Sequence, residues 1–258
     1  MKKSLLFFAV AVTCLVGCDS VNPLPDGVVL ASITHDMGDQ SWLELFEYSD
    51  TGALTSVENQ SGLGQRRSYL YAGDQLLETQ TIRLDNEQLI FRDSITYNAA
   101  GQVAKVYRFS VNGGTGLPLY QVKSMTYNSE GQLVEIASEF TGIDDYNPRE
   151  VYHWQDGNVV QVDRYNDTSL QQEFFLTYDN KTSINLESFV SLGHPEAATK
   201  NNIISTDWND YTGLLDTACK PCTVAYKYNS NGLPKSFSTN WSYSATFSYK
   251  QLPPASAF

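Results

Sequence analysis

A strand–turn–strand unit recurs along the chain and constrains the fold more than any other feature of the sequence. One copy runs from Ile95 to Val103, a second from Met125 to Leu133 and a late one from Tyr226 to Pro234. Each copy contains an Asn followed three residues later by a Gly. The Asn side chain can hydrogen-bond to the backbone that follows it, and the Gly suits the left-handed conformation that closes a short hairpin loop. The predicted structural residues of these turns are Tyr97, Asn98, Gly101, Tyr127, Asn128, Gly131, Tyr228, Asn229 and Gly232.

The aromatic residue before each turn gives the spacing of the repeat. Aligned on it, the copies stand at Tyr48, Tyr71, Tyr97, Tyr127, Trp154, Tyr178 and Tyr228. The last interval is 50 residues and is interpreted as about two units. The residue two positions before each of these aromatics is itself apolar or aromatic. The residue immediately before the aromatic is polar in six of the seven copies. This period of two predicts strands with one apolar face.

The fold class follows from the absence of helical periodicity. Without helices to cover it, a sheet of about fifteen strands must cover itself. The sequence therefore predicts an all-β protein, a large antiparallel meander of long hairpins closing into a barrel-like or wrapped sheet with little helix. A barrel this wide is expected to be flattened, occupied by a segment such as residues 183–222, or left with a cavity. An outer-membrane barrel with its apolar face toward lipid is the minority interpretation.

The repeat places its tight turns at one end of the sheet, so the remaining connections lie at the other end. These differ in length and composition, which is typical of binding loops on a fixed frame. They are expected at residues 59–64, 85–88, 112–118, 141–148 and 166–169.

The N-terminus predicts where in the cell the protein is located. Lys2 and Lys3 precede an apolar run at residues 5–16 that is too short to span a bilayer comfortably, which indicates a secretory signal peptide. The run ends in Leu15-Val16-Gly17-Cys18, which resembles the lipobox of bacterial lipoproteins. A lipid on Cys18 would anchor the chain to a membrane; an ordinary signal peptide with a stray Cys is the alternative. The predicted organisation is a signal peptide at 1–17, lipidated Cys18 and a tether at 18–27, one repeat-built β domain at 28–250 and a disordered tail at 251–258.

The net charge argues against two kinds of partner. The formal net charge is −12, and removal of Lys2 and Lys3 with the signal peptide makes it −14. Nucleic acid and anionic membrane patches require clustered Lys and Arg, so neither is an expected partner.

The mature domain holds one cysteine pair, Cys219 and Cys222. A redox-active pair of this spacing needs a helix N-terminus to stabilise the thiolate, and a zinc site needs a second pair or nearby histidines. Neither setting is predicted here. In an oxidising compartment a structural disulfide is favoured, with redox and metal roles as alternatives.

No catalytic or metal motif stands out. Asp144 and Asp145 with Asn147, and Asp207 with Asn209 and Asp210, lack the spacing of a calcium loop, so no metal and no cofactor are predicted. No nucleophile elbow, phosphate loop or metalloprotease helix occurs, and no catalytic residue is assigned. The four tryptophans, with the tyrosines, could form a sugar-stacking surface, but most are more simply sheet-face residues. They are Trp42, Trp154, Trp208 and Trp241.

The units resemble the tyrosine–aspartate repeats of Rhs-type surface and toxin-shell proteins. They resemble more closely a Bacteroidota lipoprotein family of unknown function with a porin-like β fold. The motifs that carry this resemblance are Tyr178–Lys181, an apolar stretch at 184–192, Lys200–Ile203 and Tyr228–Pro234. The resemblance implies a fold and a location but no activity.

Three functions remain in view. The favoured one is a membrane-anchored extracytoplasmic lipoprotein, not an enzyme, that binds a glycan or a peptide. It would be attached to the outer membrane or cell surface, with the periplasmic face as an alternative. The second is a structural or shell-like interaction module. The third is a glycoside-processing enzyme, whose paired carboxylates would leave no sequence signature because their pairing is spatial.

Overall fold

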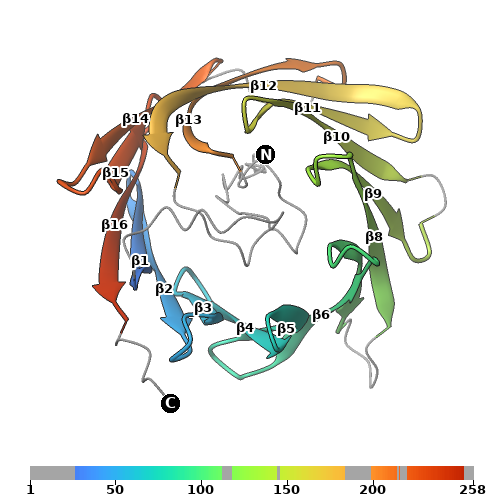
Figure 1. The fold of residues 1–258 in the computed structure, drawn as a ribbon, viewed down its shortest axis with the longest axis horizontal. Coiled ribbons are helices and arrows are strands. Elements are labelled where there is room, and N and C mark those ends of the chain that lie inside the picture. Colours follow the sequence, from blue (N-terminus) through green and yellow to red (C-terminus); the bar gives the residue numbers. More distant parts are fainter. Residues whose placement is uncertain are drawn as a thin grey trace.

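The protein is a closed antiparallel barrel of sixteen strands. The computed structural model describes residues 27–111, 118–143, 146–183, 199–213, 215 and 220–252. Each strand pairs with its neighbours in sequence, and β1 (Val28–Met37) pairs with β16 (Tyr243–Gln251) to close the ring, as the adjoining blue and red strands of Figure 1 show. The described residues contain no helix. The predicted fold class is confirmed.

No helix suited to crossing a bilayer occurs in the described part of the chain.

The strands are six to fourteen residues long. Between β1 and β16 they are β2 (Gln40–Tyr48), β3 (Leu54–Asn59), β4 (Gln65–Ala72), β5 (Gln75–Arg83), β6 (Leu89–Tyr97), β7 (Val103–Ser110), β8 (Leu119–Tyr127), β9 (Leu133–Phe140), β10 (Pro148–Gln155), β11 (Asn158–Asn166), β12 (Ser169–Thr182), β13 (Asn201–Asp210), β14 (Cys222–Tyr228) and β15 (Pro234–Thr239).

The period-two pattern sorts the side chains between two faces. The positions two before the repeat aromatics are buried or half-buried, and Phe46 is only 2% exposed. The residues between them are all exposed: Glu47, Leu70, Thr96, Thr126, His153, Thr177 and Lys227. In a closed barrel the buried face points inward. The apolar face is therefore the inner wall, and the outer wall is mostly polar.

The repeat aromatics join each hairpin to the one before it. The hydroxyl of Tyr97 donates to the carbonyl oxygen of Leu76 at 2.7 Å, and Leu76 is the second residue of β5, just past the preceding turn. The same bond recurs from Tyr127 to Val103, Trp154 to Leu133, Tyr178 to Val159 and Tyr249 to Pro234. Tyr249 is a member of the series that the alignment omits, because no turn follows it. The repeat aromatic thus bonds to the backbone as well as packing.

One prediction about spacing is wrong. The 50 residues between Tyr178 and Tyr228 were expected to hold about two repeat units. They hold only one, which runs from β12 through β13 to β14. The additional residues lie in the connections at 183–200 and 211–221. The predicted occupation of the interior by residues 183–222 is wrong for residues 201–210, which form strand β13 of the barrel wall. Residues 184–198, 214 and 216–219 lie outside the described residues.

The Asn and Gly of the repeat turns have the roles that their chemistry favours. The Asn98 side-chain oxygen accepts hydrogen bonds from the backbone N–H groups of Ala100 and Gln102, at 2.9 and 3.0 Å. Gly101 has a φ of 79° and donates its N–H to the Asn98 carbonyl oxygen. The turns at Asn128 and Asn229 repeat these bonds.

Replacing Gly101 by Val is expected to lower the free energy of unfolding by about 1–3 kcal/mol, because a β-branched residue is strained at positive φ. A Cβ built on Gly101 meets nothing within 4 Å, so the cost would be conformational rather than steric. Urea unfolding measures it. Gly101→Asn is the control and is expected to cost less, since Asn tolerates this conformation. A Val variant as stable as the parent chain would contradict the structural role of the turn.

Candidate functional site

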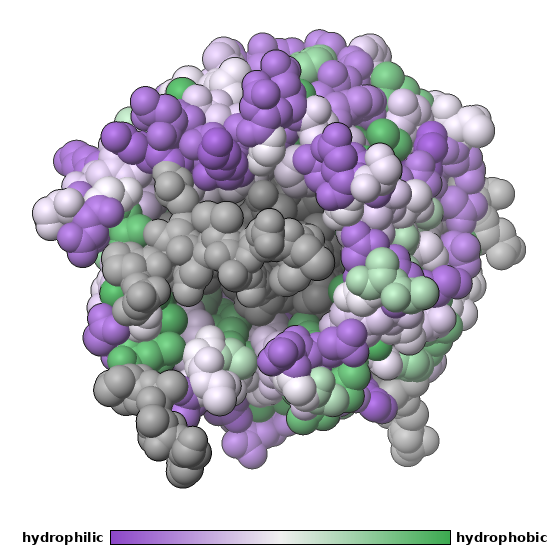
Figure 2. All heavy atoms as spheres, in the orientation of Figure 1, coloured by the Kyte–Doolittle hydropathy of each residue, from purple (hydrophilic) through white to green (hydrophobic). Residues whose placement is uncertain are grey.

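The two ends of the barrel differ. The hairpin turns after β2, β4, β6, β8, β10 and β14 lie at one end, which we call the repeat-turn end. The connections after the odd-numbered strands lie at the other, which we call the variable-loop end. They vary from two residues between β1 and β2 to eleven between β13 and β14. In Figure 2 hydrophilic residues form much of the visible rim, with smaller hydrophobic groups between them.

An aromatic cluster lies on the inner wall near the variable-loop end, where the first and last strands meet. It consists of His35, Trp42, Trp241 and Tyr243. The His35 and Trp42 rings lie opposite each other on β1 and β2 with centroids 4.8 Å apart and planes 9° apart. Tyr243 stacks on His35 at 6.0 Å and on Trp241 at 5.2 Å. These near-parallel rings run across three neighbouring strands and the β15–β16 turn.

Polar groups are joined to this cluster. His35 Nδ1 lies 2.6 Å from the Tyr243 hydroxyl, and His35 Nε2 lies 3.3 Å from Glu44 Oε2. The second distance permits an ion pair, but its geometry is not that of a hydrogen bond. Asn59 Nδ2 donates to the other Glu44 oxygen at 2.9 Å. Burial, and then the charge of Glu44, raises the pKa of Tyr243, so its hydroxyl remains protonated at neutral pH.

Charged groups continue around the inner wall. Asp93 is 1% exposed and accepts two hydrogen bonds from the guanidinium of Arg108 and one from the Thr79 hydroxyl. Farther along, Arg164 donates to Glu150 at 2.7 Å. The inner wall therefore combines an apolar layer beside the repeat turns with a more polar layer toward the variable-loop end.

The other two tryptophans have different places. Trp154 is the repeat aromatic of β10 and belongs to the repeat-turn end. Trp208 on β13 is 6% exposed, and the Lys220 ammonium lies 5.9 Å from its ring centroid. Of the four tryptophans considered for stacking, the structure brings together only Trp42 and Trp241.

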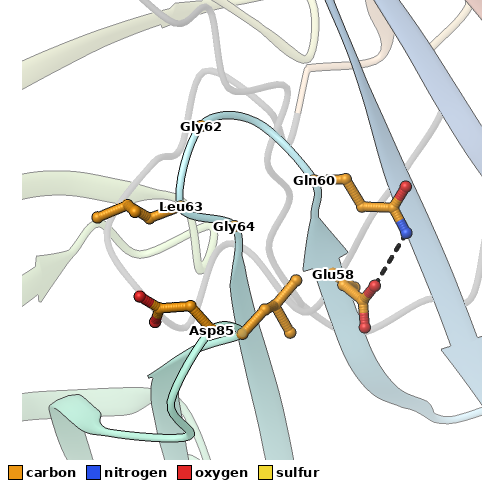
Figure 3. Close-up of a pocket in the computed structure, with 7 residues that line it drawn as sticks. Glu58, Gln60, Gly62, Leu63, Gly64 and Asp85 are labelled. Atoms are coloured by element: carbon orange, nitrogen blue, oxygen red, sulfur yellow. Dashed lines mark hydrogen bonds between the residues drawn. The ribbon is translucent and has the colours of Figure 1, made fainter.

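A separate pocket lies at the rim, where the β3–β4 and β5–β6 loops meet (Figure 3). It has a volume of about 390 Å³ and is lined by Glu58, Gln60, Gly62, Leu63, Gly64, Leu84 and Asp85. Gln60 donates to Glu58 at 3.0 Å, and Leu63 is 62% exposed. Its charged groups are both carboxylates, so it would repel an acidic ligand.

The calcium candidates on β13 do not converge. Asp207 and Asn209 lie on the exposed outer face, and Asp210 lies on the opposite face. Burial raises the pKa of Asp210, but hydrogen bonds from Leu215, Thr212 and Gln172 outweigh it and lower the pKa to about 2. The carboxylate therefore closes the turn that follows β13. Asp144 and Asp145 lie outside the described residues, in which no group of three or more metal-ligating side chains occurs.

Several predicted sites lie partly or wholly outside the described residues. Cys222 is disulfide-bonded, but Cys219 is not described, so their pairing stays a prediction. Cys18 is likewise not described. Sequence reasoning did not single out His35, Glu44 or Arg108. The available signal was polar residues at positions where the period of two requires an apolar one.

The comparisons with known proteins concern the fold. No protein-family model matches the chain, and no curated protein matches it. A porin-like protein from Bacteroides uniformis ATCC 8492 superposes with a TM-score of 0.59 at 12% identity, over 85% of this chain and 96% of that one. A porin-like protein from Bacteroides vulgatus ATCC 8482 gives 0.42 at 11% identity, over 86% and 98% of the two chains.

The TcdB2-TccC3-Cdc42 structure matches with a TM-score of 0.37 at 14% identity, over 77% of this chain and 12% of that one. A similarity of this size does not establish a shared fold, so the Rhs-type resemblance stays a prediction. The lipoprotein family also stays a prediction, because no family model matches the chain. The first match, at 12% identity, shows the fold alone: the chain is a barrel similar in architecture to a porin-like protein of Bacteroides.

Proposed function

We propose that this protein is a non-catalytic barrel of the bacterial cell envelope that binds a glycan or a peptide on its inner wall, near the variable-loop end. The observation that carries the proposal is the aromatic cluster beside Glu44 and Asn59. Stacked rings next to hydrogen-bonding side chains are the usual composition of a small-ligand site. A barrel of sixteen strands is also wider than its own wall side chains fill.

The distribution of polar residues argues against insertion of the barrel wall in a membrane. A transmembrane barrel presents an apolar band to lipid. Here exposed outer-wall positions include Glu47, Thr96, Thr126, His153 and Lys227, while most apolar positions face inward and only scattered ones, such as Leu70 and Phe175, face outward. A lipid on Cys18 would then hold the barrel at the outer membrane or the cell surface. The structural or shell-like module remains the alternative.

Replacing Trp42 or Trp241 by Ala is expected to reduce ligand affinity about tenfold or more, since aromatic anchors dominate most binding sites. A glycan and peptide array identifies the ligand, and titration calorimetry measures the affinity of each variant. Phe175→Ala is the matched control, because Phe175 is exposed on the outer wall of β12. It should bind like the parent chain.

Circular dichroism of each variant separates lost binding from lost folding. The proposal would be abandoned if the parent chain bound no glycan or peptide. It would also be abandoned if folded Trp42→Ala and Trp241→Ala variants both retained full affinity.

A further inference from the structure

Arg67 and Tyr69 are neighbouring inward residues of β4, and neither has a carboxylate partner in the described residues. The Arg67 Nε–H donates to the Thr81 hydroxyl oxygen at 3.2 Å, which fixes the guanidinium against β5. Its two terminal nitrogens make no ion pair in the described part of the barrel. Tyr69 is 7% exposed, and its buried hydroxyl has no partner there with full hydrogen-bond geometry, although the Arg67 guanidinium lies close enough to act on it.

The Tyr69 hydroxyl is a donor that remains available at neutral pH. Burial raises the pKa of Tyr69 to about 12, and the charges of Glu44 and Asp93 add to the effect, while the charge of the Arg67 guanidinium and a hydrogen bond from it partly offset it. Arg67 can only donate a hydrogen bond, so the Tyr69 O–H remains an unused donor, and a buried donor without an acceptor costs free energy relative to one that is hydrogen-bonded. A guanidinium edge and an adjacent O–H donor together match the lone pairs of an oxyanion.

The charge of the wall from β4 to β8 has the same sign, although the Glu44 carboxylate on β2 also acts on Tyr69. Inward positions of β4 to β8 carry Arg67, Arg83, Arg108 and Lys123 against a single carboxylate, Asp93. Asp93 is already neutralised by its two hydrogen bonds with Arg108. The whole chain, in contrast, has a net charge of −12. This concentration of cations on one part of the inner wall of an acidic protein favours an anion there.

We infer that Arg67 and Tyr69 form a binding point for an acidic group of the ligand, a carboxylate or phosphate carried by a glycan or peptide. This inference rests on the proposed function and specifies its ligand class. Gln65, two residues from Arg67, is the first residue of β4 at the variable-loop end, so the ligand would enter from there. Asn59 and Glu44 lie on β3 and β2, between Arg67 and the aromatic cluster. A ligand of a few units would span both.

The test compares an acidic probe with its neutral counterpart. An oligogalacturonate, its methyl ester and inorganic phosphate are titrated into the full chain by calorimetry. The acid is expected to bind at least tenfold more tightly than the ester, and phosphate is expected to compete with it. Arg67→Met should lower the affinity for the acid by at least tenfold. Arg66→Met is the matched control, because Arg66 is the next residue on the outer face of the same strand.

Tyr69→Phe separates binding from folding. Because the hydroxyl donates no hydrogen bond and has only a contact with Arg67 short of full hydrogen-bond geometry, deleting it should leave the melting temperature nearly unchanged, while the affinity for the acidic probe falls several-fold. A clear drop in melting temperature without ligand would show that the hydroxyl serves the fold, and would overturn the inference. Equal binding of acid and ester, unaffected by Arg67→Met, would overturn it and leave the proposed function standing. If none of the three probes bound while neutral glycans still bound on the array, the inference would also be overturned and the proposed function would stand.

Discussion

Replacing Asp93 by Ala is expected to lower the free energy of unfolding by about 3–5 kcal/mol. Its carboxylate bonds Arg108 at 2.7 and 2.9 Å and the Thr79 hydroxyl at 3.1 Å, on the inner wall where β5, β6 and β7 meet. Burial by itself lowers the pKa of Arg108, but the bonds to Asp93 outweigh it and the pKa is raised. Without Asp93 the guanidinium, whose side chain is only 23% exposed, would keep its charge and lose its partner. Urea unfolding followed by circular dichroism measures the change.

Glu135→Ala is the matched control for this prediction. Glu135 and Arg149 also form an Arg–carboxylate pair between neighbouring strands, but their side chains are 32% and 35% exposed. Water and salt screen such a pair, so its removal should cost about 1 kcal/mol or less. The double change Asp93→Leu with Arg108→Met should recover most of the lost stability, because it removes both charges. A loss below about 1 kcal/mol for Asp93→Ala would show that the pair does not stabilise the barrel.

Replacing Cys18 by Ala is expected to abolish lipid attachment completely. The thiol of Cys18 is the predicted acceptor of the lipid, and no neighbouring residue offers a second thiol at that position. Each buried methylene of an acyl chain contributes about 0.8 kcal/mol to membrane binding, so two chains hold a protein firmly. Incorporation of labelled palmitate by a bacterial host, with the intact mass of the product, measures the change.

Cys14→Ala is the control, because Cys14 lies within the apolar run and should be removed with the signal peptide. It should be labelled and cleaved like the parent chain. A parent chain that takes up no palmitate, or a Cys18→Ala variant that does, would remove the lipid anchor from the proposed function. The binding site on the inner wall would be unaffected by that result.

The fold was largely predictable because its determinants are local. Alternation across Phe46, Glu47 and Tyr48 assigns a strand and two faces without knowledge of any partner strand. Asn98 and Gly101 define a turn through bonds within five residues. The wrong count between Tyr178 and Tyr228 had a physical cause: a sequence interval does not distinguish a second hairpin from long connections.

The candidate site was not predictable in the same way. His35 and Tyr243 are 208 positions apart, and they meet only because β1 pairs with β16. Arg67 and Tyr69 could be assigned to one face of the strand from their period, but not identified as inward residues without a carboxylate partner. That property depends on which strands lie beside β4.

By itself the sequence determined the strands, their turns and which side chains share the apolar face, since each depends on residues close together in the chain, and it predicted the lipid on Cys18. The tertiary structure decided that the apolar face points inward. Only the tertiary structure decided how many strands close the barrel, which charged groups of the inner wall neutralise one another and which rings stack near its variable-loop end. Those outcomes depend on contacts between distant strands, whose register is set by closure of the whole ring.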